Sequence, residues 1–122
     1  AIAASHAVLD VMAEEKLPER AQKLGDQLIG HLIAKRAVYP KRMGDVRGLG
    51  AMVACEFIDA AGAPDADTTK KVQAAALKRG LLLLTCGVYG NVIRFLFPLT
   101  IEDSVFAEGL AAFDAALAEV LN

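Results

Sequence analysis

The sequence predicts an α+β domain in which helices cover a small, mainly antiparallel three-stranded sheet, in the order α-α-β-α-β-β-α. Apolar residues recur with helical spacing in four segments: two before the first expected strand, one after it, and one at the end. Between these segments lie three short apolar runs bounded by glycine or proline, which is typical of strands. A length of 122 residues fits one domain, with a helical arm at 1–40 and an α+β core at 41–122.

The arm is expected to consist of two helices that meet at a proline. The first covers 3–16, with Val8, Val11 and Met12 on one face. Leu17-Pro18 interrupts it, and Pro18 suits the first turn of a second helix that ends by Tyr39-Pro40. The apolar stripe of this second helix is Ala21, Leu24, Leu28 and Leu32. Two helices with one apolar stripe each predict a bent arm that lies against other parts of the protein.

The core is expected to begin with a loop at 41–50 and a strand at 51–58. Both faces of that strand are largely apolar, so we expect it to be covered on both sides. The glycines at 44, 48 and 50 precede a strand and not a helix, which argues against a phosphate-binding loop. They are interpreted as turn and close-packing glycines.

The second half of the core contains the remaining helices and strands. A helix is predicted from an N-cap at Asp67 or Thr68 to Arg79, closed by Gly80 in a left-handed conformation. Apolar strands follow at 81–85 and 92–97, joined by a glycine-containing turn. Thr100 is expected to cap the last helix, with Asp103 at the third helical position.

Composition excludes several classes of function. The net charge of −2 offers no electrostatic case for binding nucleic acid or an anionic membrane. No apolar run approaches the ~20 residues of a membrane span. Cys55 and Cys86 lie in apolar runs, which predicts two buried free thiols and a cytoplasmic protein. The chain opens as a helix without an initiator Met, which indicates either a segment of a longer protein or ordinary removal of Met before Ala1.

Arg94 is the single candidate binding residue. It stands between Ile93 and Phe95 in an apolar strand, with no acidic residue within seven positions. A charge in such a run needs a partner, because its burial alone is costly. That partner is either a ligand carboxylate or phosphate, for which a guanidinium is well suited, or a distant acid such as Glu56. The residues alone leave both possibilities open, together with an arginine that reaches past the sheet edge into water.

No complete catalytic constellation accompanies Arg94. His6 and His31 lie in different helices, without a nucleophile in a recognisable motif. Metal-ligand spacings and phosphate-binding loops are also absent from the sequence. The sequence therefore predicts one anion-binding candidate, no catalytic residue, no cofactor-binding residue and no metal ligand.

Four stretches of the chain carry a resemblance to a known family. They are 7–17, 46–52, 80–87 and 90–96. In this order they resemble the helix that leaves the large domain and the strands of the C-terminal small domain in class III pyridoxal-phosphate-dependent aminotransferases. Within that family, the match is nearest to the 4-aminobutyrate aminotransferase subgroup.

This resemblance implies an enzyme that moves an amino group from 4-aminobutyrate, or a similar ω-amino acid, to 2-oxoglutarate. Members are homo-oligomers that use pyridoxal 5'-phosphate, and their cofactor lysine belongs to the large domain. The resemblance thus implies that this segment alone binds no cofactor and is inactive, and that Lys70, Lys71 and Lys78 do not serve as the cofactor lysine.

The resemblance also implies a role for Arg94. In the family, the arginine at this position receives the α-carboxylate of glutamate or 2-oxoglutarate, and it pairs with a large-domain glutamate when an ω-amino acid is bound. Two alternatives are a free-standing α+β module that binds an acidic effector through Arg94, and a structural interaction domain in which Arg94 pairs with Glu56.

Overall fold

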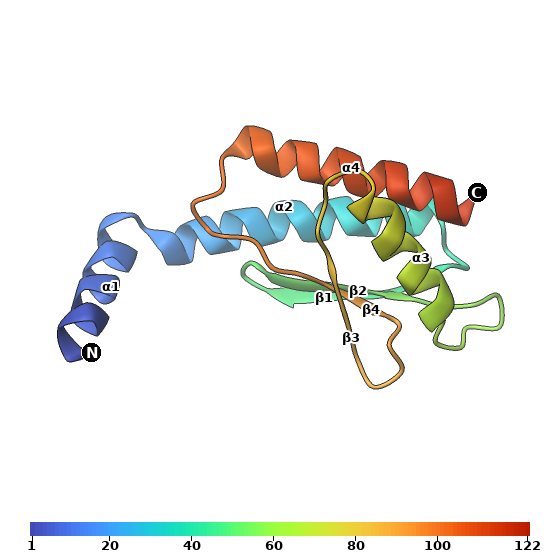
Figure 1. Ribbon diagram of the computed structural model, residues 1–122, viewed down its shortest axis with the longest axis horizontal. Coiled ribbons are helices and arrows are strands. Elements are labelled where there is room, and N and C mark those ends of the chain that lie inside the picture. The colour runs from blue at the N-terminus through green and yellow to red at the C-terminus, as the bar shows by residue number, and fades with distance from the viewer.

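A computed structural model describes residues 1–122 and contains four helices and four strands (Figure 1). The elements are, in order, α1 Ile2–Glu14, α2 Leu17–Val38, β1 Met43–Leu49, β2 Met52–Phe57, α3 Ala66–Leu77, β3 Leu84–Cys86, β4 Val92–Phe95 and α4 Asp103–Leu121. The α+β class is confirmed. The expected number of strands is wrong, because the sheet has four strands and the order is α-α-β-β-α-β-β-α.

The additional strand is β1, in a segment expected to be a loop. The strands lie in the order β1-β2-β4-β3, and all neighbours are antiparallel. β1 pairs with β2 through a turn at Gly50, whose φ of +53° suits glycine. An irregularity between Met43 and Val46 shifts the register within β1. Pairing with β2 therefore makes a strand of a segment whose own residues do not favour one.

The core lies between one face of the sheet and three helices. In Figure 1, α2 and α4 run along the upper side of the sheet, and α3 packs against β2, β3 and β4. Alternation along β2 buries Val53, Cys55 and Phe57 on this covered face. The predicted stripe of α2 also joins the core through Leu24, Leu28 and Leu32.

No helix packs on the opposite face of the sheet in this chain, and we call it the open face. Met52 of β2 is 62% exposed there. The expectation that β2 is covered on both sides is therefore wrong for this chain. That expectation rests on the apolar residues of both faces, but Met52 is exposed and Ala54 is only partly buried.

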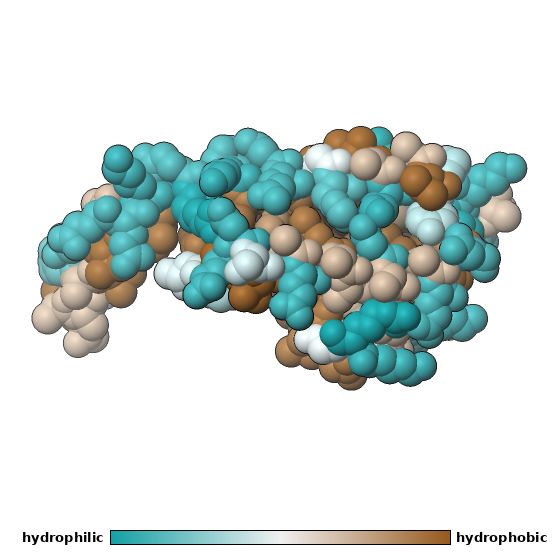
Figure 2. Space-filling view, turned by 90° about the horizontal axis from the view of Figure 1, so that it is seen from above, coloured by the Kyte–Doolittle hydropathy of each residue, from teal (hydrophilic) through white to brown (hydrophobic).

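The arm is bent, as expected. Lys16 joins the two helices with φ +51°, and Pro18 lies in the first turn of α2. Helix α1 points away from the core and buries none of its residues (Figure 1). Hydrophobic residues consequently show among polar ones over α1 at the left of Figure 2.

The ends of several elements differ from the predictions. Asp65 caps α3, not Asp67 or Thr68: its carboxylate accepts bonds from the Thr68 backbone N at 2.9 Å and the Thr68 Oγ1 at 2.6 Å. Glu102 precedes α4 without a side-chain capping bond, so the predicted Thr100 cap is wrong. Gly80 does take a left-handed conformation, with φ +80°. The strands β3 and β4 are shorter than the apolar runs that predicted them.

No helix in this chain combines the length and the apolar character that crossing a membrane requires.

Candidate functional site

The candidate site is a row of side chains on the open face of the sheet. Arg47 of β1 is paired with Ala54 of β2, and Ala54 is paired on its other side with Arg94 of β4. Leu84 of β3 then follows Arg94. Three neighbouring strands thus place one arginine on each side of Ala54.

Alternation in β4 explains why Arg94 lies on this face. Ile93 and Phe95 point into the core, so the residue between them must point to the opposite face. β4 is an inner strand, bonded to β2 on one side and β3 on the other, so the backbone of Arg94 is held on both sides. The arginine predicted from the sequence is therefore surface-accessible on a fixed strand.

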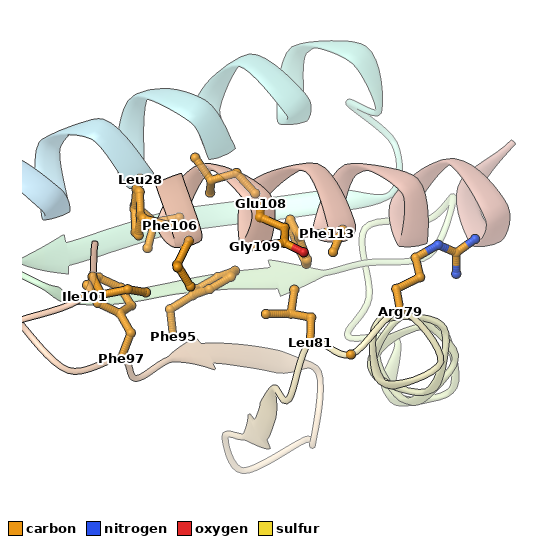
Figure 3. A pocket seen from close by; sticks show the side chains of 14 residues that line it. Leu28, Arg79, Leu81, Phe95, Phe97, Ile101, Phe106, Glu108, Gly109 and Phe113 are labelled. Carbon is orange, nitrogen blue, oxygen red and sulfur yellow. The ribbon is translucent and has the colours of Figure 1, made fainter. Parts of the chain in front are cut away.

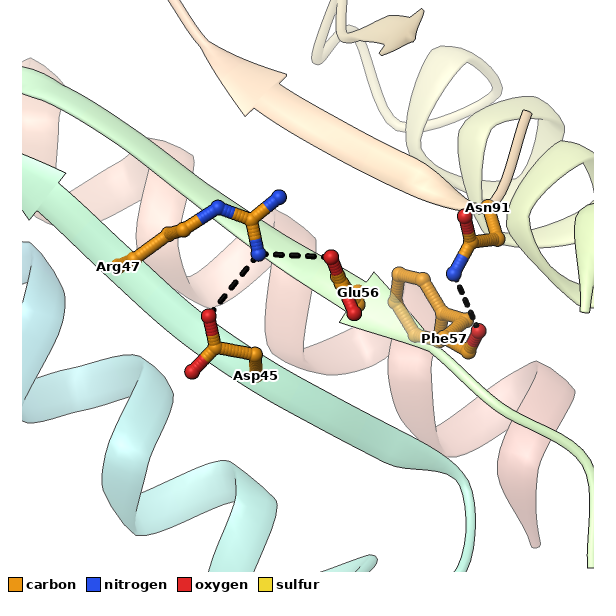
Figure 4. A network of polar contacts seen from close by, with 5 residues as sticks. All are labelled: Asp45, Arg47, Glu56, Phe57 and Asn91. Atoms are coloured by element: carbon orange, nitrogen blue, oxygen red, sulfur yellow. Dashed lines mark hydrogen bonds and ion pairs between the residues drawn. The ribbon is translucent and has the colours of Figure 1, made fainter. Parts of the chain in front are cut away.

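Arg94 takes part in none of the ion pairs or side-chain hydrogen bonds of this chain. The alternative in which Glu56 pairs with Arg94 is wrong for this structure. Glu56 Oε1 instead accepts a bond from Arg47 Nη1 at 2.7 Å (Figure 4). The same nitrogen lies 3.0 Å from Asp45 Oδ2. The bond to Glu56, followed by that to Asp45, raises the pKa of the Arg47 guanidinium.

Asn91 anchors the start of β4 next to this row. Its side-chain Nδ2 donates to the Phe57 carbonyl oxygen at 3.1 Å (Figure 4), while the Phe57 backbone N donates to the Asn91 carbonyl oxygen at 2.8 Å. Asn91 is buried, so these bonds satisfy polar groups that water does not reach. The strand that carries Arg94 is therefore fixed to β2 at its first residues.

The sequence does not predict the polar network formed by Asp45, Arg47 and Glu56. The sequence offers Glu56 as a possible partner of Arg94, but Asp45 and Arg47 lie in the segment expected to be a loop. Their alternation with Val46 on a strand was the available signal, and the glycines around them obscured it.

The two histidines and the lysines of α3 lie away from the open face. His6 is exposed on α1, and His31 Nε2 lies 2.7 Å from Asp114 Oδ1, between α2 and α4. Lys70, Lys71 and Lys78 are exposed on or just after α3, which packs on the covered face. No group of three or more His, Cys, Asp or Glu residues is placed to hold a metal ion.

A cavity of about 280 Å³ lies on the covered side of the sheet, between α4 and the segments around β3 and β4 (Figure 3). Its lining is mostly apolar, with rings from Phe95, Phe97 and Phe106. Arg79 lies at its edge but is already bonded to Glu119, at 2.6 Å. The cavity is separate from the open face and offers no unpaired cation.

Comparisons with known proteins agree with the resemblance seen in the sequence. The family described as Aminotransferase class-III matches residues 1–117. The 5-aminovalerate aminotransferase of Pseudomonas putida is 45% identical over 121 residues, covering 98% of this chain and 28% of that protein. The 4-aminobutyrate aminotransferase of Escherichia coli is 46% identical over 105 residues, covering 84% of this chain and 24% of that protein.

A solved structure shows the same fold. It is an amine transaminase from an uncultivated Pseudomonas species in the pyridoxal-phosphate-bound form, with a TM-score of 0.80 and 32% identity. The match covers 97% of this chain and 27% of that protein. This chain therefore spans about a quarter of the length of the proteins it matches. Because the family match covers nearly all of its residues, the chain belongs to the class-III aminotransferases.

Proposed function

We propose that this chain is the C-terminal small domain of an ω-aminotransferase, and that Arg94 binds the α-carboxylate of glutamate or 2-oxoglutarate. The observation that carries the proposal is a guanidinium on an inner strand that no acid in the chain pairs with. The amino donor is 4-aminobutyrate, 5-aminovalerate or a similar ω-amino acid, because relatives over 40% identical are named for those substrates.

The surroundings of Arg94 suit a carboxylate. Its cross-strand neighbours are Ala54 and Leu84, which have no polar side-chain atom to compete for the guanidinium. A guanidinium can donate two parallel bonds to one carboxylate. The neighbouring strands β2 and β3 hold the backbone of Arg94 in place. Substrate binding therefore has to order only the side chain of Arg94, which lowers its entropic cost.

The remaining parts of the reaction are assigned to the rest of the enzyme. The family uses pyridoxal phosphate, which when bound accepts the amino group from one substrate and passes it to the other. We assign the residues that hold it to a large domain in the same longer chain, and we expect that chain to form a homo-oligomer. In this division, residues 1–40 are the arm and residues 41–122 the substrate-facing core.

Arg94→Lys and Arg94→Ala in the complete enzyme test this proposal, with the two half-reactions measured separately in single turnovers. Arg94→Ala is expected to lower kcat/KM for glutamate by about 30-fold or more, because truncating one partner of a desolvated charge pair costs about 2–5 kcal/mol. Arg94→Lys keeps the charge but loses the paired geometry, so its loss is smaller. The ω-amino acid half-reaction should lose less in both variants, because we expect its carboxylate to reach the large domain.

The matched control is Arg36→Lys on α2, an arginine that makes no ion pair and lies away from the open face. It should leave both half-reactions unchanged. Equal losses in the two half-reactions of Arg94→Lys, or no loss with glutamate, would show that Arg94 does not bind the α-carboxylate. An enzyme that transfers no amino group from any ω-amino acid would overturn the assigned substrate class.

A further inference from the structure

The register of the sheet places Glu56 between two arginines. Arg47 and Arg94 are both paired with Ala54, from opposite sides of β2. Glu56 is two residues further along β2, on the same face. It is therefore a diagonal neighbour of each arginine, a separation of roughly 7–8 Å that long side chains can bridge. By backbone position alone, this one carboxylate can reach either guanidinium.

The structure shows which arginine it binds. Glu56 Oε1 lies 2.7 Å from Arg47 Nη1, and Asp45 Oδ2 lies 3.0 Å from the same nitrogen. Asp45 precedes Arg47 by two residues on β1, and no acid has the corresponding position on β4, where Val92 stands. Asp45 thus explains why Glu56 bonds to Arg47 and not to Arg94, because Asp45 holds the Arg47 guanidinium where Glu56 can reach it.

We propose that Arg47 is a positioning residue that, together with Asp45, holds the Glu56 carboxylate away from Arg94 and so keeps Arg94 open to substrate. This inference rests on the proposed function of Arg94. The Glu56 side chain is only 29% exposed, so it gains from a cationic partner and would turn to Arg94 if Arg47 were lost. A substrate carboxylate would then have to displace it.

Such competition acts on binding and leaves the chemical step alone. When only a fraction of the enzyme has a free Arg94, the apparent affinity for a ligand of Arg94 falls by that fraction. We therefore expect a higher KM for 2-oxoglutarate with little change in kcat. The KM for the ω-amino acid should change less, because its carboxylate binds elsewhere in our proposal.

The experiment uses the complete enzyme with Arg47→Met, which keeps the aliphatic part of the side chain and removes the charge. Its KM for 2-oxoglutarate is expected to rise roughly tenfold. The double variant Arg47→Met/Glu56→Gln should recover most of this loss, since no carboxylate remains to compete. Arg47→Met/Asp45→Asn is the matched control: it removes an acid from the same face that is not a cross-strand neighbour of Arg94, and should give no recovery.

A crystal structure of Arg47→Met provides a second measurement, in which Glu56 should lie within bonding distance of Arg94. If Arg47→Met fails to fold, Arg47→Lys keeps part of the pair with Glu56 and should show a smaller rise in KM that Glu56→Gln again reverses. A rise in KM that Glu56→Gln does not reverse, or no rise at all, would overturn the role of Arg47. These outcomes are separate from failure of the proposed function, which would appear as an Arg94→Lys enzyme with an unchanged glutamate half-reaction.

Discussion

Gly25 of α2 lies against the carbonyl oxygen of Gly50 in the β1–β2 turn, so closely that a Cβ at position 25 would be 1.8 Å from that oxygen. The helix therefore contacts the hairpin backbone directly at this point. This contact sets the distance between α2 and the strands β1 and β2, which carry Arg47 and Glu56. A side chain at position 25 would separate the arm from the core, because backbone atoms cannot move aside as a flexible side chain can.

Gly25→Ala is accordingly expected to destabilise the chain, although alanine favours helix. Overpacking of this kind costs about 1–3 kcal/mol, against a gain in helix propensity of at most about 1 kcal/mol. Gly30→Ala on the same helix is the matched control, since no atom lies within 4 Å of a Cβ there. It should raise the free energy of unfolding by about 0.5–1 kcal/mol. Denaturant titrations of both variants provide the comparison, and equal effects would contradict the close contact.

The Asp65 cap predicts a specific dependence of stability on pH. Hydrogen bonds from the Thr68 hydroxyl and then the Thr68 backbone N lower the pKa of the Asp65 carboxyl below its ordinary value. A carboxyl with a lowered pKa in the folded state contributes stability that is fully present above its unfolded pKa of about 3.9. That contribution is lost as the pH falls through the folded pKa.

Asp65→Asn keeps a good capping residue but cannot titrate, so its unfolding free energy should approach that of the wild type as the pH falls below about 4. Asp65→Ala should lose about 0.5–2 kcal/mol at neutral pH because it also loses the cap. Unfolding curves measured between neutral and acidic pH test both statements. A constant difference between wild type and Asp65→Asn across that range would count against a stabilising carboxylate.

The two cysteines should differ in reactivity. Burial raises the pKa of the Cys55 thiol to about 12, and its side chain has no exposed surface. Cys86 on β3 is only half-buried, which corrects the expectation of two buried thiols. Because the thiolate is the reactive form, the native chain should react with a thiol reagent at one site, and Cys86→Ser should abolish that reaction. Fast labelling of Cys55 before unfolding would contradict this arrangement.

The parts of the fold that the sequence predicts well are those with strong periodicity. The stripe of α2 and the alternation that turns Arg94 away from Ile93 and Phe95 can both be read directly from residue spacing. β1 could not be predicted in this way, because its glycines and charges have no strand preference. Its structure comes from pairing with β2, a contact that no local pattern reports.

The candidate site also has one part that the sequence predicts and one that it does not. Arg94 could be found from the sequence because a charge in an apolar strand is conspicuous. Its relation to Glu56 could not, because that depends on the register of three strands. The sequence suggested Glu56 as the internal partner of Arg94, whereas the register makes Arg47 an equally near competitor, and Asp45 favours Arg47. Only the pairing of β1 brings those two residues to the site.

The 122-residue chain by itself is expected to self-associate. Leu49 and Met52 are 79% and 62% exposed at one end of the open face, and α1 leaves all its apolar residues uncovered. We expect these surfaces to contact the large domain in the complete enzyme, so the isolated chain presents them to water. Contiguous exposed apolar surfaces of this kind commonly associate, here with a second copy of the chain.

Met52→Lys should weaken this association, since a charge on the open face has to be desolvated when two copies meet. Leu77→Lys is the matched control, because Leu77 is similarly exposed, at 59%, but lies on α3 at the other side of the sheet. Sedimentation over a range of concentrations should show dimers or larger species for the wild type and for Leu77→Lys, and a larger monomer fraction for Met52→Lys. Binding of a dye that recognises apolar surface should fall in Met52→Lys as well.

A wild-type chain that stays monomeric at high concentration and binds no such dye would show that the open face and α1 do not drive association. An equal effect of the two lysine variants would show instead that the chain associates through another surface.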